Sequence, residues 1–513
     1  MPYQIAPVPA HPQGEPLSPL SQAVQLTLDT PGKRFHVEWD PAAPVTPLGH
    51  LVFFSQFLAA GGLFGPWVAQ CPLHYTSPNA PAVVDVLGTL TLGILAGQHR
   101  YAHLTALRAD RVNPAGLGMS KVCSEDSARR AFAESDPLAV AAWQHQHLQA
   151  CWEPALDQPW VLDIDTTIKP IYGHQEGATL GYNPFKPGRP SHAYHTYFVA
   201  RLRLVLDVEV QAGNRHAAGH GLAGLWQLWE RLKPSQRPEL IRGDCAYGHE
   251  KAMTDCEERH QAYLFRLRQT AKVKALIQFM ERQGHWQPAG GEWSALESTL
   301  RLSGWSTERR VVVLRRPLAA EHAQPGPRRL PLQAGELALE VVVSQDPTHE
   351  YCVLVTNTGY EPCALGDLYR QRADAENALD ELKNQWGWGG FTTRDLLRCQ
   401  VMARIMAQVY NWWNLFVRCA QPARPREAIT SRPLLLWSVG RVVEHAHQSV
   451  LRLTSTHGDA AQAQRLLTGL SVFLSGLMNR AEQLTSPQRW QRIWDRILTP
   501  FRVAVAALPG PAG

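Results

Sequence analysis

The sequence predicts an α/β protein whose core is interrupted by a mostly β insertion and flanked by helical N- and C-terminal regions. Three observations predict this class. Short apolar strands such as WVLDIDTTI, ELIRGD and YCVLVTNTG alternate with amphipathic helices, strand-like runs fill residues 271–350, and apolar helical patterns occupy both flanks. A chain of 513 residues is expected to form roughly two to four domains.

Composition places the chain among large globular proteins. With 45% hydrophobic residues it can bury large cores, and a net charge of +5 with a pI near 8.7 is compatible with nucleic-acid binding without establishing it. The N-terminus shows no secretory signal pattern, and no apolar stretch is long enough to span a membrane, so an intracellular protein is expected. The nine cysteines contain no CxxC pair, which argues against disulfides and a zinc site.

The N-terminal third is predicted to hold an arm and a helical domain. Residues 1–46 are rich in Pro and contain one strand-like piece, Arg34–Asp40, which indicates a partly ordered arm. Residues 47–155 have apolar helical patterns, and a Ser-x-x-Ser turn ahead of Arg129 and Arg130 is typical of the short helix in a helix-turn-helix unit. The region is therefore a candidate DNA-binding domain, with plain helical packing as the alternative.

Two aspartates lie on one side of the first predicted core strand. In WVLDIDTTI, alternation puts Asp163 and Asp165 on one face and Leu162 and Ile164 on the other. An unpaired carboxylate on a half-buried strand is costly, so a nearby cation or metal ion is expected. An arginine partner or a solvent-exposed strand edge would explain the same pattern.

A Gly- and Pro-rich loop and another aspartate follow. In the loop, Lys186 and Arg189 can approach a backbone phosphate and Tyr172 can stack on a base, although a rigid hairpin tip without a ligand has the same composition. Asp244 comes just past a short predicted strand, beside a glycine, where α/β folds place functional groups. A turn or helix-capping aspartate is the alternative for Asp244.

Residues 271–350 are predicted to form the β insertion. The strand-like runs STLRLSGW, RRVVVLRRPL and ELALEVVVSQ account for much of it. Four arginines bracket the middle run, and alternate ones can face DNA or guard a solvent-exposed strand edge: Arg309, Arg310, Arg315 and Arg316.

The stretch ALGDLYRQRADAENALDELK, residues 364–383, is predicted to be helical over most of its length because it lacks Pro and is dense in helix formers. At about 100° per residue, four polar side chains project within an arc of roughly 60°: Tyr369, Arg372, Glu376 and Lys383. A carboxylate among cations suits metal and phosphate chemistry, whereas a surface helix laced with salt bridges is the alternative. A long aromatic helix follows, and residues 421–513 are expected to form a C-terminal helical region for dimerisation or DNA contact.

The spacing Tyr, two residues, Arg, three residues, Glu, six residues, Lys resembles the Y-R-E-K signature of bacterial insertion-sequence transposases, which are DDE enzymes with a ribonuclease-H-like core. The segments YGHQEGA and GYNPFKPGRPS resemble one branch of that group. The resemblance implies a catalytic core in two parts, 156–270 and 351–420, separated by the β insertion.

The acidic residues match the same family. Asp165, followed by two threonines, resembles the first-aspartate motif and is favoured over Asp163, and Asp244 resembles the second aspartate. With Glu376, these side chains would hold two Mg²⁺ or Mn²⁺ ions, which suit hard oxygen ligands and phosphoryl transfer.

The resemblance implies a transposase that performs metal-dependent cleavage and strand transfer at the terminal inverted repeats of an insertion sequence, by a cut-and-paste route. Its partners would be double-stranded end and target DNA and a second copy of the chain, in the bacterial cytoplasm at the nucleoid. The expected DNA contacts are Tyr369, Arg372, Lys383, Lys186, Arg189, Arg129 and Arg130.

Two other functions fit parts of the pattern. A transposase-derived DNA-binding protein would keep the fold without cleaving, although the intact acidic set argues against it. A glycosidase could use Asp165 and Glu376 as its carboxylate pair, but that would leave the arginine and lysine near Glu376 unexplained.

Overall fold

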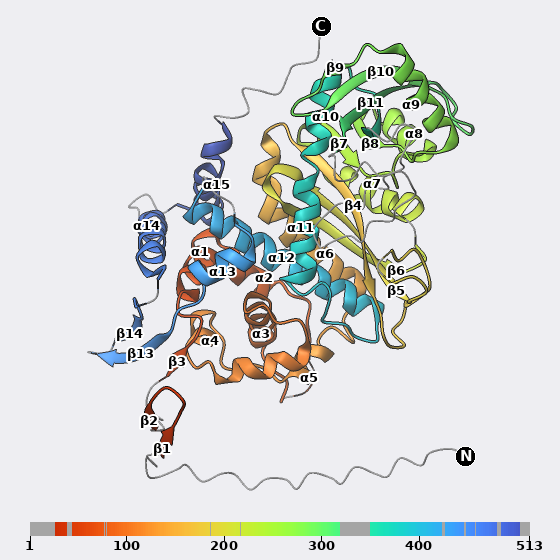
Figure 1. The fold of residues 1–513 in the computed structure, drawn as a ribbon. Helices are drawn as coiled ribbons and strands as arrows, with labels where there is room; N and C mark the ends of the chain where they lie inside the picture. Colours follow the sequence, from red (N-terminus) through yellow and green to blue (C-terminus); the bar gives the residue numbers. More distant parts are fainter. Residues whose placement is uncertain are drawn as a thin grey trace, which may run out of the picture.

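A mixed nine-stranded β-sheet forms the centre of the fold, in the strand order β6-β5-β4-β7-β8-β12-β11-β10-β9 (Figure 1). Strands β4, β7 and β8 are parallel, and the other neighbours pair antiparallel. The strands are β4 Val161–Pro170, β5 Ser191–Val199, β6 Leu204–Ala212, β7 Leu240–Gly243, β8 Tyr263–Arg266, β9 Gln287–Pro288, β10 Ser294–Leu300, β11 Arg309–Pro317 and β12 His349–Thr356.

The fold is known from a computed structural model. It describes residues 26–37, 44–75, 77, 79–184, 186–215, 217–318, 349–422, 426–445, 448–456, 458–479 and 484–502. The expected strand ELALEVVVSQ and the first 25 residues of the expected arm lie outside the described residues.

Both faces of the sheet are covered, which explains why most residues of β5, β7, β8 and β12 are buried. One face packs on a large core that includes Ile164, Tyr197 and Phe265. The opposite face packs on a smaller cluster that includes Leu264 and Leu368. Neighbours in sequence, such as Leu264 and Phe265, therefore lie in different cores, as expected when side chains alternate along a strand.

The helices that connect the strands place the ends of β4, β7 and β8 side by side. A π-helical turn, Ala217–Gly221, leads into α7 Leu222–Arg231, and α8 Glu250–Glu258 joins β7 to β8. The predicted β insertion begins with a helix, α9 Ala271–Gln283, so its opening residues contradict the β expectation. Its described strands, β9 to β11, extend the central sheet beyond β12.

Residues 364–383 are helical over most of their length, as predicted, but the single helical face expected for the four polar side chains is wrong, because the helix breaks after Arg370. The structure contains two helices, α10 Pro362–Arg370 and α11 Ala373–Asn384, with Arg372 at the N-cap position of α11. Figure 1 shows both helices on the same side of the sheet as one another, with α11 beside β4. Tyr369 and Glu376 therefore lie on different helices rather than on one helical face.

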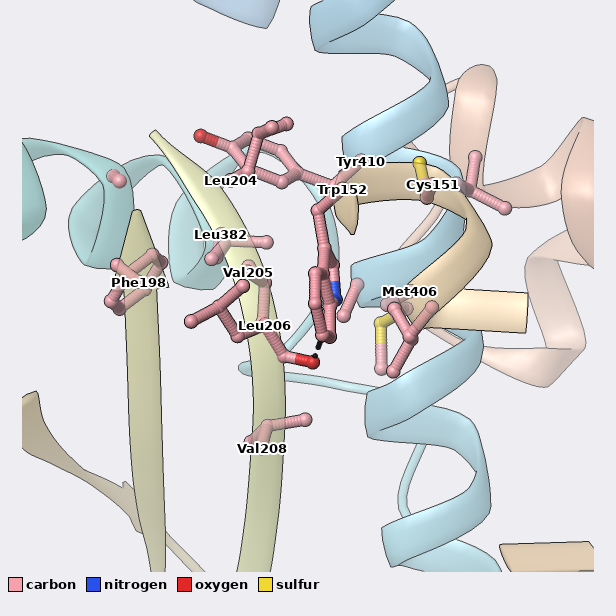
Figure 2. Close-up of a cluster of buried hydrophobic side chains, with 14 of the residues drawn as sticks. Cys151, Trp152, Phe198, Leu204, Val205, Leu206, Val208, Leu382, Met406 and Tyr410 are labelled. Atoms are coloured by element: carbon pink, nitrogen blue, oxygen red, sulfur yellow. Dashed lines mark hydrogen bonds between the residues drawn. The ribbon is translucent and has the colours of Figure 1, made fainter. Parts of the chain in front are cut away.

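The long aromatic helix expected after this region is α12 Leu396–Ala420, and its side chains are core residues as predicted. It packs with α6 Pro137–Trp152 against β6. Figure 2 shows Trp152 of α6 and Met406 and Tyr410 of α12 beside the side chains of β6, with the Trp152 indole N–H donating to the Leu206 carbonyl at 3.2 Å.

The N-terminal and C-terminal helices share one core. Ring centroids of Phe57 in α1 and Trp490 in α15 lie 6.0 Å apart, and those of Trp67 in α2 and Trp412 in α12 lie 5.2 Å apart. The flanking helices are α1 Leu51–Gly61, α2 Phe64–Ala69, α3 Val83–Leu95, the 3-10 helix Tyr101–Ala109, α4 Asn113–Gly116, α5 Glu125–Arg130, α13 Ala428–Leu435, α14 Ala460–Met478 and α15 Ser486–Arg502.

The described part of the expected C-terminal helical region contains α13, α14 and α15, and a β-hairpin lies between α13 and α14. Strands β13 Gly440–His445 and β14 Gln448–Leu453 form a hairpin that pairs with β3 Val45–Thr46. Their alternating residues and paired valines favour a strand. Within the expected arm, β1 Leu26–Asp29 pairs with β2 Arg34–Val37, and among the described helices none is long and apolar enough to cross a membrane.

Candidate active site

The two aspartates of β4 have different partners. Arg242 of β7 donates two hydrogen bonds of 2.7 Å to the Asp163 carboxylate, and both side chains are almost fully buried. Asp165 accepts a hydrogen bond from the Thr166 backbone N–H at 2.7 Å and another from the Arg372 guanidinium at 2.6 Å. Asp163 is therefore neutralised within the sheet, whereas Asp165 faces the loop between α10 and α11.

Asp244 lies at the neighbouring strand end. It follows directly after β7, which is parallel to β4, and its side chain accepts a hydrogen bond from the Ala246 N–H at 2.9 Å. The carboxyl ends of parallel strands meet at one edge of a sheet. Asp244 is accordingly close enough to act electrostatically on Asp165 and on Glu376.

Glu376 reaches the same place from α11. Arg372 donates to both Glu376 and Asp165, so one nearly buried guanidinium bridges α11 and β4. The break between α10 and α11 puts Arg372 at this position, since it precedes the first residue of α11. The sequence-predicted acids Asp165, Asp244 and Glu376 thus come together from three elements.

The pKa values of two of these acids are raised. Burial raises the pKa of Asp165 to about 6 and that of Glu376 to about 7, against the opposing attraction of Arg372, and the Asp244 carboxylate adds to both increases. When all three carboxylates are ionised, Arg372 balances only part of their charge. The three acids and Arg372 therefore carry a net negative charge, and the nearby Lys383 and Arg266 offset part of the charge of Asp165 and Asp244.

Hard oxygen donors and excess negative charge are the features that a divalent cation such as Mg²⁺ prefers. Within the described ranges, however, no three His, Cys, Asp or Glu side chains are arranged to hold an ion, and Arg372 instead engages two of the acids. The donor set fits a divalent ion chemically, and Arg372 occupies one oxygen of Asp165 and one oxygen of Glu376.

The other residues of the predicted polar row lie around this cluster. Tyr369, near the end of α10, interacts electrostatically with Arg372 and Asp244, and burial raises its pKa. Lys383, near the end of α11, interacts with Asp165 and lines a small cavity with Thr167 and Trp388; burial lowers its pKa. The row therefore reaches one site although the helix is broken.

The remaining predicted DNA contacts lie on other surfaces. Lys186 and Arg189 both stack on the exposed ring of Tyr172, at 5.0 and 4.9 Å from its centroid. Arg129 and Arg130 on α5 both pair with Asp126, at 2.5 and 3.2 Å. Among the described residues, no hydrogen bond, ion pair or ring contact joins these four cations to the acidic cluster, so they are separate surface groups.

The four arginines that bracket β11 all have carboxylate partners. Arg309 pairs with Glu250 and Glu257 and is buried, Arg310 pairs with Glu297, and Arg315 pairs with Glu281. Arg316 pairs with Glu350. The charges of these arginines are therefore paired with acidic side chains, and β11 lies between β10 and β12 rather than at a sheet edge, so the strand-edge alternative is wrong. Contact of alternate members with DNA stays a prediction.

Several residues around the acids were not predicted from the sequence. Thr166 Oγ1 lies 2.9 Å from His195 Nδ1 and 3.3 Å from the Tyr247 hydroxyl, directly behind Asp165. Arg266, which ends β8 one position beyond the partner of Gly243, interacts electrostatically with Asp244 and Tyr369. A lone His in a strand and an Arg in an apolar strand carry no local signal, although the alternation of YLFR does put Arg266 on the face opposite Phe265.

The sequence matches the family described as "Transposase DDE domain group 1" over residues 80–473, and the chain belongs to that family. Membership makes it a DNA-acting recombination protein of the class that cleaves DNA and transfers strands, generally with divalent metal ions. A solved piggyBac transposase synaptic complex with hairpin DNA is similar at 11% identity, covering 92% of this chain and 89% of that chain, with a TM-score of 0.40. No match was found among curated proteins.

Proposed function

We propose that this protein is a cut-and-paste DNA transposase of the Y-R-E-K group, with a ribonuclease-H-like core, that cleaves and joins DNA at the terminal inverted repeats of an insertion sequence. The observation that carries the proposal is the meeting of Asp165, Asp244 and Glu376 from β4, the end of β7 and α11. Family membership over residues 80–473 supports the same reaction class.

In this reaction the three acids would hold two Mg²⁺ or Mn²⁺ ions, which when bound activate the attacking oxygen and stabilise the leaving 3′ oxygen. Arg372, once released from Asp165, would grip phosphate oxygens with its planar fork. Lys383 would hold a neighbouring phosphate as a point charge, and Tyr369 would hydrogen-bond the DNA end. Nucleophiles would be water for nicking and a 3′-hydroxyl for joining.

The wider organisation is proposed on the same basis. The catalytic core would comprise 156–270 and 351–420, with 271–350 as the insertion between them. The region 47–155 would bind DNA ends through Arg129 and Arg130, and Lys186 and Arg189 would contact backbone phosphates. The arm 1–46 and the region 421–513 would contribute to DNA contact or to a homodimer that brings two ends together.

The decisive test uses the purified chain and linear DNA that carries the two ends of the genetic element encoding it. With Mg²⁺ we expect nicks that leave 3′-hydroxyl groups at the ends, and with EDTA none. Asp165→Asn, Asp244→Asn and Glu376→Gln should each abolish cleavage while end binding persists in a mobility-shift assay.

Asp367→Asn is the matched control, because Asp367 is an exposed acid on α10 whose partner is Arg370. It should cleave like the unmodified chain. If the unmodified chain binds the ends tightly but shows no Mg²⁺-dependent nicking, the proposed cleavage activity is rejected. The alternative, a transposase-derived DNA-binding protein, is then favoured.

A further inference from the structure

A buried polar group lies behind Asp165, on the sheet face opposite the acidic cluster. Thr166 of β4 and His195 of β5 are directly paired residues of adjacent strands, and Thr166 Oγ1 is 2.9 Å from His195 Nδ1. The Tyr247 hydroxyl lies 3.3 Å from the same Oγ1 atom. We call Thr166, His195 and Tyr247 the support triad.

Two glycines make room for the support triad. A Cβ atom on Gly243, at the end of β7, would lie 2.9 Å from the Tyr247 ring. A Cβ atom on Gly221, at the end of the π-helical turn, would lie 3.0 Å from the Tyr247 hydroxyl and 3.2 Å from His195 Nδ1. The polar atoms are therefore enclosed by backbone on two sides, and π-helical turns are frequent at functional sites.

Enclosure keeps the triad dry and its histidine neutral. His195 and Tyr247 are almost fully buried, and burial lowers the pKa of His195 to about 4. Thr166 itself is half-buried, and its hydroxyl is oriented by hydrogen-bonding distance to the two buried neighbours, His195 and Tyr247.

Each end of the triad is joined to a different candidate catalytic acid. The Thr166 backbone N–H donates to the Asp165 carboxylate at 2.7 Å. Tyr247 belongs to the turn that starts at Asp244, since its N–H donates to the Asp244 carbonyl at 3.1 Å. The hydrogen bond between Thr166 and Tyr247 therefore spans β4 and the Asp244 turn.

We propose that Thr166, His195 and Tyr247 are positioning residues that set the distance between Asp165 and Asp244 and so the spacing of the metal site. This inference rests on the proposed function, because it assigns the triad a role at that site. The triad touches neither the reacting phosphate nor the ions. Its effect passes through the two acids that it connects, as outer contacts of metal ligands commonly do.

The test combines Tyr247→Phe and Thr166→Val, which remove the hydroxyls and keep the shapes. Each should raise the Mg²⁺ concentration for half-maximal cleavage about tenfold and lower kcat, with KM for end DNA unchanged. The double variant should be little worse than Thr166→Val alone, because Thr166→Val already removes the contact to Tyr247 along with the contact to His195. Thr166→Ser keeps the hydroxyl, so its Mg²⁺ concentration for half-maximal cleavage should equal that of the unmodified chain.

Tyr263→Phe is the matched control, because Tyr263 is a buried tyrosine on β8 whose hydroxyl donates to Glu257 at 2.8 Å instead. It should lower the melting temperature about as much as Tyr247→Phe without changing the Mg²⁺ requirement. A second readout is Mn²⁺ binding in the presence of end DNA, followed by electron paramagnetic resonance, which does not require turnover.

The outcomes distinguish the proposed function from the positioning role of the support triad. If the unmodified chain neither cleaves nor binds Mn²⁺, the proposed function fails and the positioning role fails with it. If the unmodified chain cleaves and Tyr247→Phe and Thr166→Val keep its Mg²⁺ and Mn²⁺ dependence, the positioning role alone is overturned. A tenfold change shared by Tyr263→Phe would likewise overturn it, as a general effect of stability.

Discussion

At the residue scale, two aspartates on one face of β4 differ in how their charges are compensated. Asp163 shares a buried pair with Arg242, from which it is separated by 79 residues in sequence. Asp165 shares Arg372 with Glu376 and lies within the influence of Asp244. Alternation along the strand predicts that both acids need a cation, but it cannot distinguish them, because the partners come from distant segments.

This difference predicts that removing the two aspartates costs unequal amounts of stability. Asp163→Ala leaves the Arg242 guanidinium buried and unpaired, which should reduce the free energy of unfolding by about 3–5 kcal/mol. Asp165→Ala should cost much less, because it removes a carboxylate whose burial is unfavourable and leaves Arg372 paired with Glu376. Urea unfolding followed by circular dichroism measures both, and equal losses in the two variants would contradict the assignment.

Arg372 provides a second prediction at this scale. Arg372→Lys keeps the charge but replaces the planar fork by a single ammonium, which cannot bridge Asp165 and Glu376 in the same way. We expect cleavage to fall about tenfold or more and end binding to weaken, because the two-pronged phosphate contact is lost, whereas the salt dependence of binding should change little, because the positive charge is kept. Fluorescence anisotropy with labelled end DNA over a NaCl series measures the binding.

Arg370→Lys is the control for that variant, because Arg370 on α10 pairs with Asp367 rather than with the acidic cluster. It should leave both cleavage and the salt dependence close to those of the unmodified chain. Lys383→Ala removes a positive charge, so it should weaken end binding and lower the slope of log K against log [NaCl] by about one. An unchanged affinity and slope would remove Lys383 from the DNA contacts.

At the element scale, strands with a clear period of two were predictable and helix boundaries were not. WVLDIDTTI, YLFR and YCVLVTNTG are strands of the central sheet, as their alternation or apolar runs indicate. The break between α10 and α11 falls within a sequence of good helix formers, and Arg372 at the break is held by tertiary contacts to Asp165 and Glu376. Local propensity contains no signal for such a break.

Helix α6 gives a prediction about acid sensitivity. His147 is buried beside Trp143, and burial lowers its pKa to about 4. His147 binds a proton near pH 6.5 in the unfolded chain but stays neutral in the folded chain until about pH 4. The free energy of unfolding therefore keeps the full contribution of the neutral His147 above pH 6.5 and decreases as the pH falls toward 4. The full loss is at most roughly 3 kcal/mol.

The variant His147→Leu should remove that part of the pH dependence. Its free energy of unfolding should fall less steeply between pH 6.5 and 4 than that of the unmodified chain, measured by urea titration at a series of pH values. His103 on the 3-10 helix is exposed, so His103→Leu serves as the control and should leave the slope unchanged. Parallel curves for His147→Leu and the unmodified chain would contradict the burial argument.

At the scale of the whole molecule, the order of strands in the sheet brings the residues of the candidate site together. Strands β4, β7 and β8 are neighbours although α7 and α8 intervene in sequence, so the end of each strand contributes a polar residue to one edge. The sequence indicated an α/β core and its acids. It could not show that β9 to β11 continue the same sheet or that the C-terminal region contains a hairpin, because strand neighbours are set by long-range pairing.

The shared core of the N- and C-terminal helices leads to a prediction about cooperativity. Trp490 of α15 packs against Phe57 of α1, and its indole N–H donates to the Ala150 carbonyl at the end of α6 at 2.9 Å. One side chain thus joins three segments that are far apart in sequence. Removing it should loosen all three together rather than release α15 alone.

Trp490→Ala should therefore lower the free energy of unfolding by about 3–5 kcal/mol, the usual cost of deleting a large buried aromatic side chain. Val472→Ala on α14 is the control, because Val472 is 69% exposed and its truncation should cost less than about 0.5 kcal/mol. Hydrogen exchange measures where the loss occurs: α1, α6 and α15 should lose protection together. Loss confined to α15 would show that the C-terminal helix is an independent attachment, and would separate the flanking regions into domains that the shared core argues against.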